Sequence, residues 1–504
     1  MAVSSDIFEL IKGMNRKERS YFRRYFKLSS AGRNGVMIKL FERLVFYSGK
    51  FGDYDEEKLK GTLTPSEVKH LPVVKNNLYK LILRSLLEYR NDQSNDAMIK
   101  RLIEQYDLLF SRSLLKQSET VLKKAKRIAE ENELFQHIHT ILNKERVLAR
   151  YMLNADEYEN VIKRVYIEQM ICLERIKNLS EMNDLGSRIT LMLQKYPTSK
   201  SRDENLSKEI NEVLDNPLLR DEQKMLSGTA LKRFYNINIV LSEWRKDYNA
   251  ALIYAKKYAD EVEKDADKNK STVHDYIISI HSLITESTRT NDIDEYESAY
   301  SKLSNVKTRF PSATERDMLE AFYYLGLSVF TASGENYHPE RGENMLAEAE
   351  ANSKQLEQTL STQQKIVWYF LIARMFFGQN SFNGAGKWLN RLIAIPNIDL
   401  SQDYQCYGRI MNLVVAYESG NPDSIEHELR RTYYFLTKRN KVYKYEKIIL
   451  EYLRQSFRIK TERGISEMLV FMNRDLKAIS TDPFEENAFD AFNIIKWLEW
   501  KIGE

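Results

Sequence analysis

Residues 368–397, "WYFLIARMFFGQNSFNGAGKWLNRLIAIPN", decide the fold because they spell two amphipathic helices joined by a short turn. The first helix places aromatic, apolar and small residues on one face, namely Tyr369, Ile372, Ala373 and Phe376. After the turn "GQNS" the second helix repeats this order with Phe382, Ala385, Leu389 and Leu392, and Pro396 ends it. The small residues let two antiparallel helices approach closely, and the large ones fill the space between them.

This unit resembles the tetratricopeptide pattern, and parts of it recur along the chain. Its second half returns in "NDIDEYESAYSKLSNVKTRFP" (291–311) and "RKDYNAALIYAKKY" (245–258). Fainter copies surround Ser118, Tyr158, Tyr337 and Asp423. Successive turns are separated by about 40 to 48 residues, with one longer interval of about 90. We interpret the longer interval as two units, one of which lies near Leu206 and has a poorly matching sequence.

The composition agrees with an all-α chain. Gly (18) and Pro (9) are scarce among 504 residues, and apolar spacings of three and four recur where strands would alternate. A single helical hairpin cannot bury its apolar face, so neighbouring hairpins must stack. We therefore predict an all-α, irregular helical-hairpin repeat solenoid, a tetratricopeptide-like superhelix with helical caps at both ends.

Three segments are predicted within this architecture. Residues 1–92 form a basic N-terminal helical module that ends near "RNDQSND". Residues 93–480 form the tetratricopeptide-like repeat array. Residues 481–504 form a C-terminal capping helix, in which Phe489, Phe492, Trp497 and Trp500 close the core.

The whole chain also resembles an uncharacterised bacterial family of tetratricopeptide-like helical-repeat proteins. Four stretches carry the resemblance: "ELIKGMNRKERSYFRRYF", "NNLYKLILRSLLEYR", "AYESGNPDSIEHELRRTYYFLTKRNKVYKYEKIILEYLR" and the terminal "WLEWKI". None of them is a catalytic motif. The resemblance therefore implies a fold and assigns no activity.

Motifs of the common catalytic and metal sites are missing from the sequence. It has no Gly-rich phosphate loop, nucleophile elbow, His-Glu-x-x-His or paired Cys-x-x-Cys. Cys172 and Cys406 stand alone, and His274 and His281 would lie about 10 Å apart along one helix, too far to share a metal. We expect no enzyme activity, no catalytic or metal-binding residues and no cofactor. With no apolar stretch long enough to span a bilayer, we also expect no membrane insertion and a cytoplasmic location.

Positive charge gathers in two regions. Residues 1–50 hold 11 Lys/Arg against 4 Asp/Glu, and residues 430–460 hold 10 against 2. A helix over residues 15–28, begun by Asn15 with Glu18 as capping partner, gathers six cations on one face: Arg16, Lys17, Arg19, Arg23, Arg24 and Lys27. Its aromatic rings and Leu28 take the other face. This separation disfavours a base-stacking platform, which needs both on one surface.

The second basic region lies on a predicted helix from about residue 441 to 458. Val442, Tyr445, Ile449 and Leu453 form its buried side. The candidate contacts there and in the preceding turn are Lys438, Arg439, Lys441, Lys444, Lys447, Arg454 and Arg458. Mixed Lys and Arg without repeated spacing favour backbone or acidic-surface attraction over base readout.

Two functions follow as hypotheses. The first is a non-catalytic scaffold whose concave surface binds a protein or peptide, as stacked hairpins usually do. The second is a nucleic-acid associated protein, linked to RNA or the ribosome through the terminal basic helix faces. In either case a simply solvated helix face remains an alternative for each basic region, and the sequence leaves the oligomeric state open.

Overall fold

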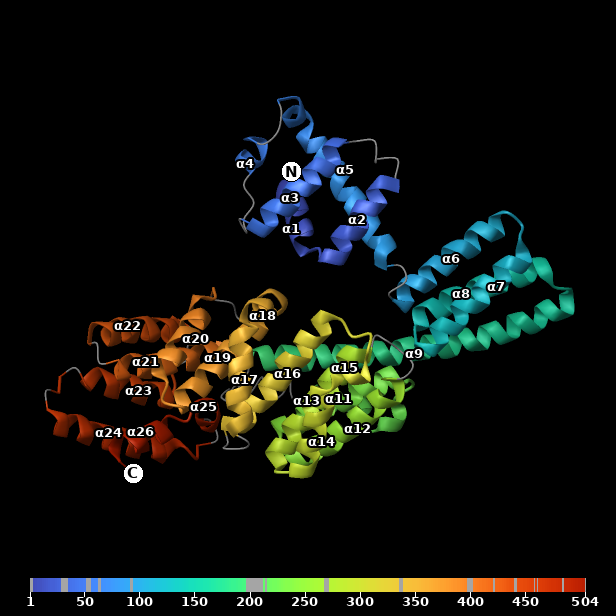
Figure 1. The fold of residues 1–504 in the computed structure, drawn as a ribbon. Coiled ribbons are helices and arrows are strands. Elements are labelled where there is room, and N and C mark those ends of the chain that lie inside the picture. Colours follow the sequence, from blue (N-terminus) through green and yellow to red (C-terminus); the bar gives the residue numbers. More distant parts are fainter. Residues whose placement is uncertain are drawn as a thin grey trace. The chain divides into compact units, whose positions relative to one another are not determined.

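All the regular elements that the structure describes are helices (Figure 1). The computed structural model describes residues 3–28, 35–50, 56–61, 65–90, 94–195, 212–213, 215–266, 272–334, 339–396, 402–419, 422–438, 442–456, 458–459, 461–482 and 485–503. No strand occurs in these ranges, so the all-α prediction is confirmed. Within the same ranges, no helix is long and apolar enough to cross a membrane.

The chain divides into two compact units, Met1–Ile176 and Lys177–Glu504. This division falls inside the predicted repeat array rather than near residue 92 or 480. The buried side chains form three clusters, spanning residues 7–82, 99–172 and 182–498. The first two clusters belong to the N-terminal unit and the third to the C-terminal unit.

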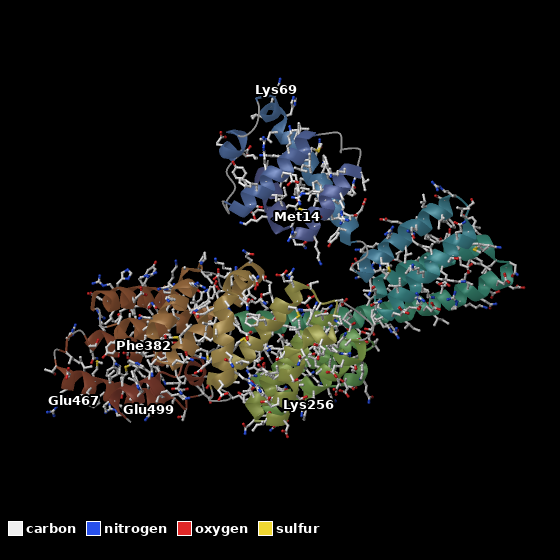
Figure 2. All side chains as sticks on the ribbon, in the orientation of Figure 1. Met14, Lys69, Lys256, Phe382, Glu467 and Glu499 are labelled. Atoms are coloured by element: carbon white, nitrogen blue, oxygen red, sulfur yellow. The ribbon has the colours of Figure 1, made fainter. Side chains whose placement is uncertain are left out.

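The N-terminal unit begins with five helices around the first cluster. They are α1 (Val3–Gly13), α2 (Arg16–Leu28), α3 (Gly35–Lys50), α4 (Glu56–Gly61) and α5 (Pro65–Arg90). Ile7, Phe22, Phe41 and Ile82 are fully buried among them. Figure 2 labels Met14 among these helices, directly after the end of α1.

Four further helices of this unit surround the second cluster. They are α6 (Asn95–Ser111), α7 (Leu115–Glu131), α8 (Phe135–Met152) and the first part of α9 (Ala155–Lys195). Ala125, Ile141, Leu142 and Val165 are fully buried between them. Ser118 and Tyr158, around which two repeat copies are predicted, are each the fourth residue of a helix, α7 and α9, so the turns themselves end just before Leu115 and Ala155. The unit predicted near Leu206 lies outside the described residues.

The C-terminal unit continues the series of hairpins. Its α-helices are α11 (Gly228–Trp244), α12 (Tyr248–Ala266), α13 (Thr272–Thr290), α14 (Ile293–Ser304), α15 (Val306–Arg309), α16 (Glu315–Gly334), α17 (Pro339–Ala351), α18 (Ser353–Thr359), α19 (Thr362–Gly378), α20 (Phe382–Ala394), α21 (Gln402–Glu418), α22 (Pro422–Lys438), α23 (Lys444–Ser456), α24 (Glu462–Ile479), α25 (Glu486–Ala491) and α26 (Ile494–Ile502). Two 3-10 turns, Pro217–Leu219 and Glu222–Lys224, precede α11. From α13 to α23 the first helix of each hairpin also contacts the first helix of the next, so the hairpins stack.

One turn geometry recurs between helices of both units. Its central residue has a left-handed φ of 52° to 60°, at Ser113, Glu133, Lys246, Asn291 and Asn380. In each turn the next residue donates its N–H to the carbonyl five positions back, for example Ser381 to Phe376 at 2.9 Å. The donated bonds satisfy carbonyls that the helix end leaves unpaired. The repeat is thus a repeat of turn geometry as well as of apolar spacing.

The stretch at residues 368–397 forms the predicted hairpin, α19 and α20. Ile372, Ala373, Ala385 and Leu389 are fully buried, as their positions on the two helix faces predict. The helices stop at Gly378 and begin again at Phe382. Close packing of this kind depends on small residues at the contact.

The predicted C-terminal cap is part of the core of the C-terminal unit. Phe489, Phe492 and Trp497 are buried in the same cluster as α11 to α24, whereas Trp500 is half exposed. Tyr445 Oη donates to the Phe492 carbonyl at 2.8 Å. The segment therefore folds back onto several hairpins, including α19 and α23, with Phe492 against Phe377.

Candidate functional site

The predicted basic helix at the N-terminus exists as α2, with the predicted start. Asn15 N donates to Glu18 Oε2 and Glu18 N to Asn15 Oδ1, both at 2.9 Å, which makes a capping box. Phe22 and Phe26 are buried, in agreement with the predicted apolar face. Leu28 does not belong to that face, because it lies at the helix end and is 90% exposed.

Two of the six cations predicted on α2 serve the fold. Arg19 donates to the Ile11 carbonyl at 2.9 Å, and burial, aided by the charge of Arg23, lowers its pKa. Arg23 makes a bidentate pair with Glu42 on α3 at 2.7 and 2.8 Å, and its hydrogen bond to Glu42 raises its pKa. Both side chains therefore hold α2 against its neighbours. As candidate partner contacts, Arg19 and Arg23 stay predictions, and both side chains already have partners within the fold.

The other four cations of α2 point outward. Arg16, Lys17, Arg24 and Lys27 are exposed, and none of them forms an ion pair with another described residue. At about 100° per residue they fall within an arc of about 100°, opposite Phe22 and Phe26. They form one basic ridge on the N-terminal helices.

The second basic region is less continuous than predicted. The helix α23 begins at Lys444 and ends at Ser456, so Lys438 lies at the end of α22 and Arg458 in a turn beyond α23. Lys444 forms an ion pair with Asp482 at 3.0 Å within the same unit. Lys447 and Arg454 stay exposed on α23, while Arg439 and Lys441 lie outside the described residues. The predicted single stripe is thus divided among three local structures.

The structure adds a site that the sequence did not indicate, a cavity of about 280 Å³ between α7, α8 and α9. Its lining combines apolar and charged groups. The apolar part is Leu122, Ile141, Leu148, Ala149, Met152, Leu153 and Val161, and the charged part is Glu119, Lys123, Lys126, Glu145 and Arg164. Small-molecule sites usually measure about 300 to 1,000 Å³, so this space suits one or two side chains of a peptide.

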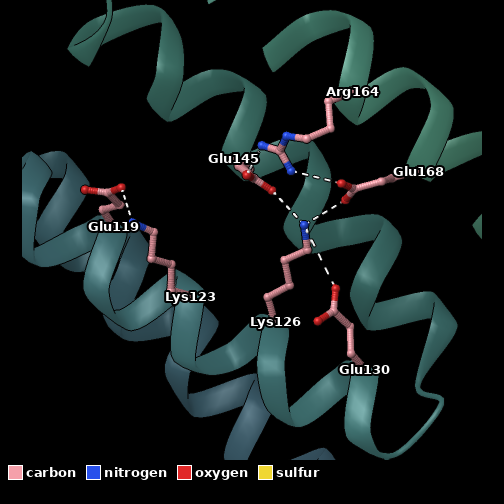
Figure 3. Close-up of polar contacts among 7 residues, drawn as sticks. All are labelled: Glu119, Lys123, Lys126, Glu130, Glu145, Arg164 and Glu168. Atoms are coloured by element: carbon pink, nitrogen blue, oxygen red, sulfur yellow. Dashed lines mark hydrogen bonds and ion pairs between the residues drawn. The ribbon is translucent and has the colours of Figure 1, made fainter. Parts of the chain in front are cut away.

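Three of the lining residues, Lys126, Glu145 and Arg164, belong to a charge network (Figure 3). Lys126 Nζ on α7 lies 2.7 Å from Glu168 Oε2 on α9 and 3.2 Å from Glu145 Oε2 on α8. Arg164 on α9 completes the network by pairing with Glu145 and, at 3.0 Å, with Glu168. Three helices are thereby joined around one partly buried cation.

The pKa shifts agree with this geometry. Burial by itself lowers the pKa of Lys126, but the hydrogen bond to Glu168 and the charge of Glu145 outweigh it and raise that pKa. Burial raises the pKa of Glu168, and the bond to Lys126 outweighs it, so the Glu168 carboxyl titrates below its ordinary range. Both directions favour the charged forms of Lys126 and Glu168, as their direct ion pair requires.

A second, shallower cavity of about 420 Å³ adjoins the first at the start of α7. Ser113, Leu114, Leu115, Lys116 and Gln117 line it, and Met152 belongs to both cavities. Leu114, Tyr151 and Leu153 around it are 40%, 62% and 38% exposed. Exposed apolar side chains beside a cavity are a common feature of interaction surfaces. Met152 is suited to line both cavities because its flexible thioether side chain adapts to different neighbours.

Sequence reasoning missed this surface because its parts come from distant positions. The Lys126 contacts join residues 19 and 42 positions apart. The short apolar run "YML" at 151–153, near the end of a predicted helix, was the one available signal. Among the described residues, no group of three or more His, Cys, Asp or Glu side chains could hold a metal ion.

Comparison with protein-family models and with curated proteins finds no match for this chain. The class that the structure defines is an all-α protein built of stacked helical hairpins.

Proposed function

We propose that the protein is a non-catalytic helical-repeat scaffold that binds a protein or peptide partner. The observation that carries the proposal is the amphipathic cavity between α7, α8 and α9, whose lining combines apolar and charged side chains. Stacked hairpins present such surfaces as a consequence of their architecture. The partner segment would place an apolar side chain against Met152 and polar groups near Lys123 and Glu119.

Binding at this cavity can be tested by affinity recovery from an extract of the native cells, with nuclease present throughout. We expect a stoichiometric protein to be recovered with the wild type and lost with Met152→Glu, because a carboxylate in the shared wall opposes an apolar anchor. The matched control is Leu226→Glu, which adds the same charge at a 43% exposed apolar position of the C-terminal unit. Recovery that is equal for both variants contradicts binding at this cavity.

Folding of the variants must be separated from binding. Met152 is only partly buried, so Met152→Glu should leave the helical circular dichroism of the protein unchanged. If that variant unfolds, Leu153→Glu tests the same wall from a more exposed position. Loss of partner with retained helicity then assigns the defect to the surface.

Nucleic-acid association is a second candidate, favoured by the outward ridge of Arg16, Lys17, Arg24 and Lys27 on α2. If each cation neutralises one phosphate of a duplex, the logarithm of the binding constant should fall with that of salt with a slope of about −3.6. Charge reversal at all four positions should abolish this binding, whereas reversal of Lys447 and Arg454 on α23 should preserve it. Absence of salt-dependent binding by the wild type rejects this candidate and leaves the ridge as a solvated face.

A further inference from the structure

The outward face of α9 in the N-terminal unit is unusually apolar. Val165 and Cys172 point into the core and are 0% and 3% exposed. On the opposite side four large apolar residues are about half exposed: Tyr166 63%, Ile167 58%, Met170 43% and Ile171 46%. At about 100° per residue these four fall within an arc of about 140°. An apolar face of this width on a helix predicts a covering partner.

The spacing of residues along this face is the same from either end. A cation precedes two apolar pairs, and a carboxylate follows them at matching intervals, in the series Lys163, Tyr166, Ile167, Met170, Ile171 and Glu174. A two-fold axis that runs between two antiparallel copies of this helix, at the level of Glu168 and Gln169, would place each apolar pair opposite the other pair of the second copy. The same axis would bring Lys163 of one helix opposite Glu174 of an antiparallel copy.

We propose that a second copy of this chain docks on this face, so that two α9 helices pack antiparallel about a two-fold axis. Tyr166 then faces Ile171 of the other copy, and Ile167 faces Met170. Each end of the interface closes with one Lys163–Glu174 pair between copies. Such an interface is self-complementary, as a two-fold dimer requires.

The charges at both ends are available for this pairing. Glu174 is exposed and has no ion-pair partner among the described residues. Lys163 pairs with Glu159 on its own helix at 2.6 Å, but both side chains are more than 60% exposed. Exposed pairs of this kind contribute little, so Lys163 can exchange its partner.

The size of the face sets the expected affinity. Four half-exposed large side chains per copy, with Ile162 and Leu173 at the margins, give an interface near the lower limit for specific association, about 1,000 Å². We therefore expect a reversible dimer with a dissociation constant on the order of 10 μM. The face is separate from the proposed peptide cavity, so this inference does not rest on the proposed function.

Sedimentation velocity of the full chain between about 1 and 200 μM tests the proposal, since this range brackets the expected constant. We expect a monomer–dimer equilibrium that Ile167→Glu weakens at least tenfold, because two carboxylates would meet at an apolar contact. The matched control is Val470→Glu on α24, at an apolar position 46% exposed, which should leave the equilibrium unchanged. A monomer at all concentrations, as expected if a different protein or nothing covers this face, overturns the proposal. A dimer insensitive to Ile167→Glu does so too.

Charge exchange tests the antiparallel register and does not depend on any apolar substitution. Lys163→Glu alone brings two carboxylates together at each end, and Glu174→Lys alone brings two ammonium groups together. Each variant should dimerise at least threefold more weakly than the wild type. An equimolar mixture of the two should recover wild-type association, because the mixed dimer pairs opposite charges at both ends. If the mixture associates no better than either variant alone, the proposed register is wrong.

Discussion

Single residues fix how closely the hairpins approach. Gly326 on α16 is the clearest case, because a Cβ atom placed there would lie 2.4 Å from Cη2 and 2.6 Å from Cζ3 of Trp368. The Trp368 ring is 1% exposed and packs against Phe330 and Tyr323, so it has no free direction in which to move. Glycine is required at this position by space, since its φ is not left-handed.

We expect Gly326→Ala to lower the free energy of unfolding by about 1 to 3 kcal/mol, even though alanine favours the helix by up to about 1 kcal/mol. Gly378→Ala is the matched control, because no atom lies within 4 Å of a Cβ there and the residue is exposed. Denaturant unfolding of both variants measures the difference. Equal effects would show that Trp368 does not limit the α16–α19 approach.

A second residue gives the C-terminal unit a pH dependence. His281 on α13 is partly buried, with Nδ1 2.8 Å from Ser328 Oγ and its ring against Tyr324. Burial lowers its pKa to about 4, from an ordinary value of 6.5. The unfolded chain therefore binds a proton more readily than the folded one between these values, and stability is fully present above pH 6.5 and lost as the pH falls toward 4.

His281→Gln should remove part of the loss of folding stability in acid, by up to about 1.4 kcal/mol for each pH unit below 6.5. His427→Gln on α22 is the control, because that side chain is 68% exposed. Thermal unfolding between pH 7 and 4.5 compares the variants with the wild type. The interpretation is wrong if His281→Gln leaves the acid slope unchanged.

At the scale of elements, side-chain bridges decide which helices hold together. Lys126 joins α7 to α8 and α9, and its side chain is only 18% exposed. Lys126→Met should destabilise the N-terminal unit by about 1 to 3 kcal/mol, because Glu145 and Glu168 lose the cation between them. Lys100→Met should change stability by no more than about 0.5 kcal/mol, since its pair with Asp96 is exposed. Denaturant midpoints that move equally would show that the network contributes no more than a surface pair.

The elements also show which parts of the structure could be predicted from the sequence. The hairpin at 368–397 was predictable because close helix packing leaves a local pattern of small and large residues. The α2 capping box was predictable for the same reason, as Asn15 and Glu18 stand three positions apart. The Arg23–Glu42 pair and the Lys126 network were not, because each joins helices that only the tertiary fold brings together. In the sequence alone, Lys and Arg residues that form structural ion pairs therefore look the same as those of a free basic face.

Across the whole molecule, the two units have separate cores, so we expect each unit to unfold independently of the other. Ile141 and Leu389 are both 0% exposed, the first in the N-terminal unit and the second in the C-terminal one. Each change to alanine should cost about 2 to 5 kcal/mol, within its own unit. Hydrogen exchange should show faster exchange confined to residues before 176 for Ile141→Ala and after 177 for Leu389→Ala. Faster exchange throughout the chain in either variant would indicate one cooperative molecule.

The proposed scaffold function requires a partner that occupies the cavity between α7, α8 and α9. This occupancy can be measured by hydrogen exchange of the full chain, with and without the partner protein that affinity recovery in the presence of nuclease yields. We expect added protection over residues 141–164, where α8 ends and α9 begins, and none with Met152→Glu. Protection confined to residues 16–28 of α2, or no change along the chain, would contradict the account.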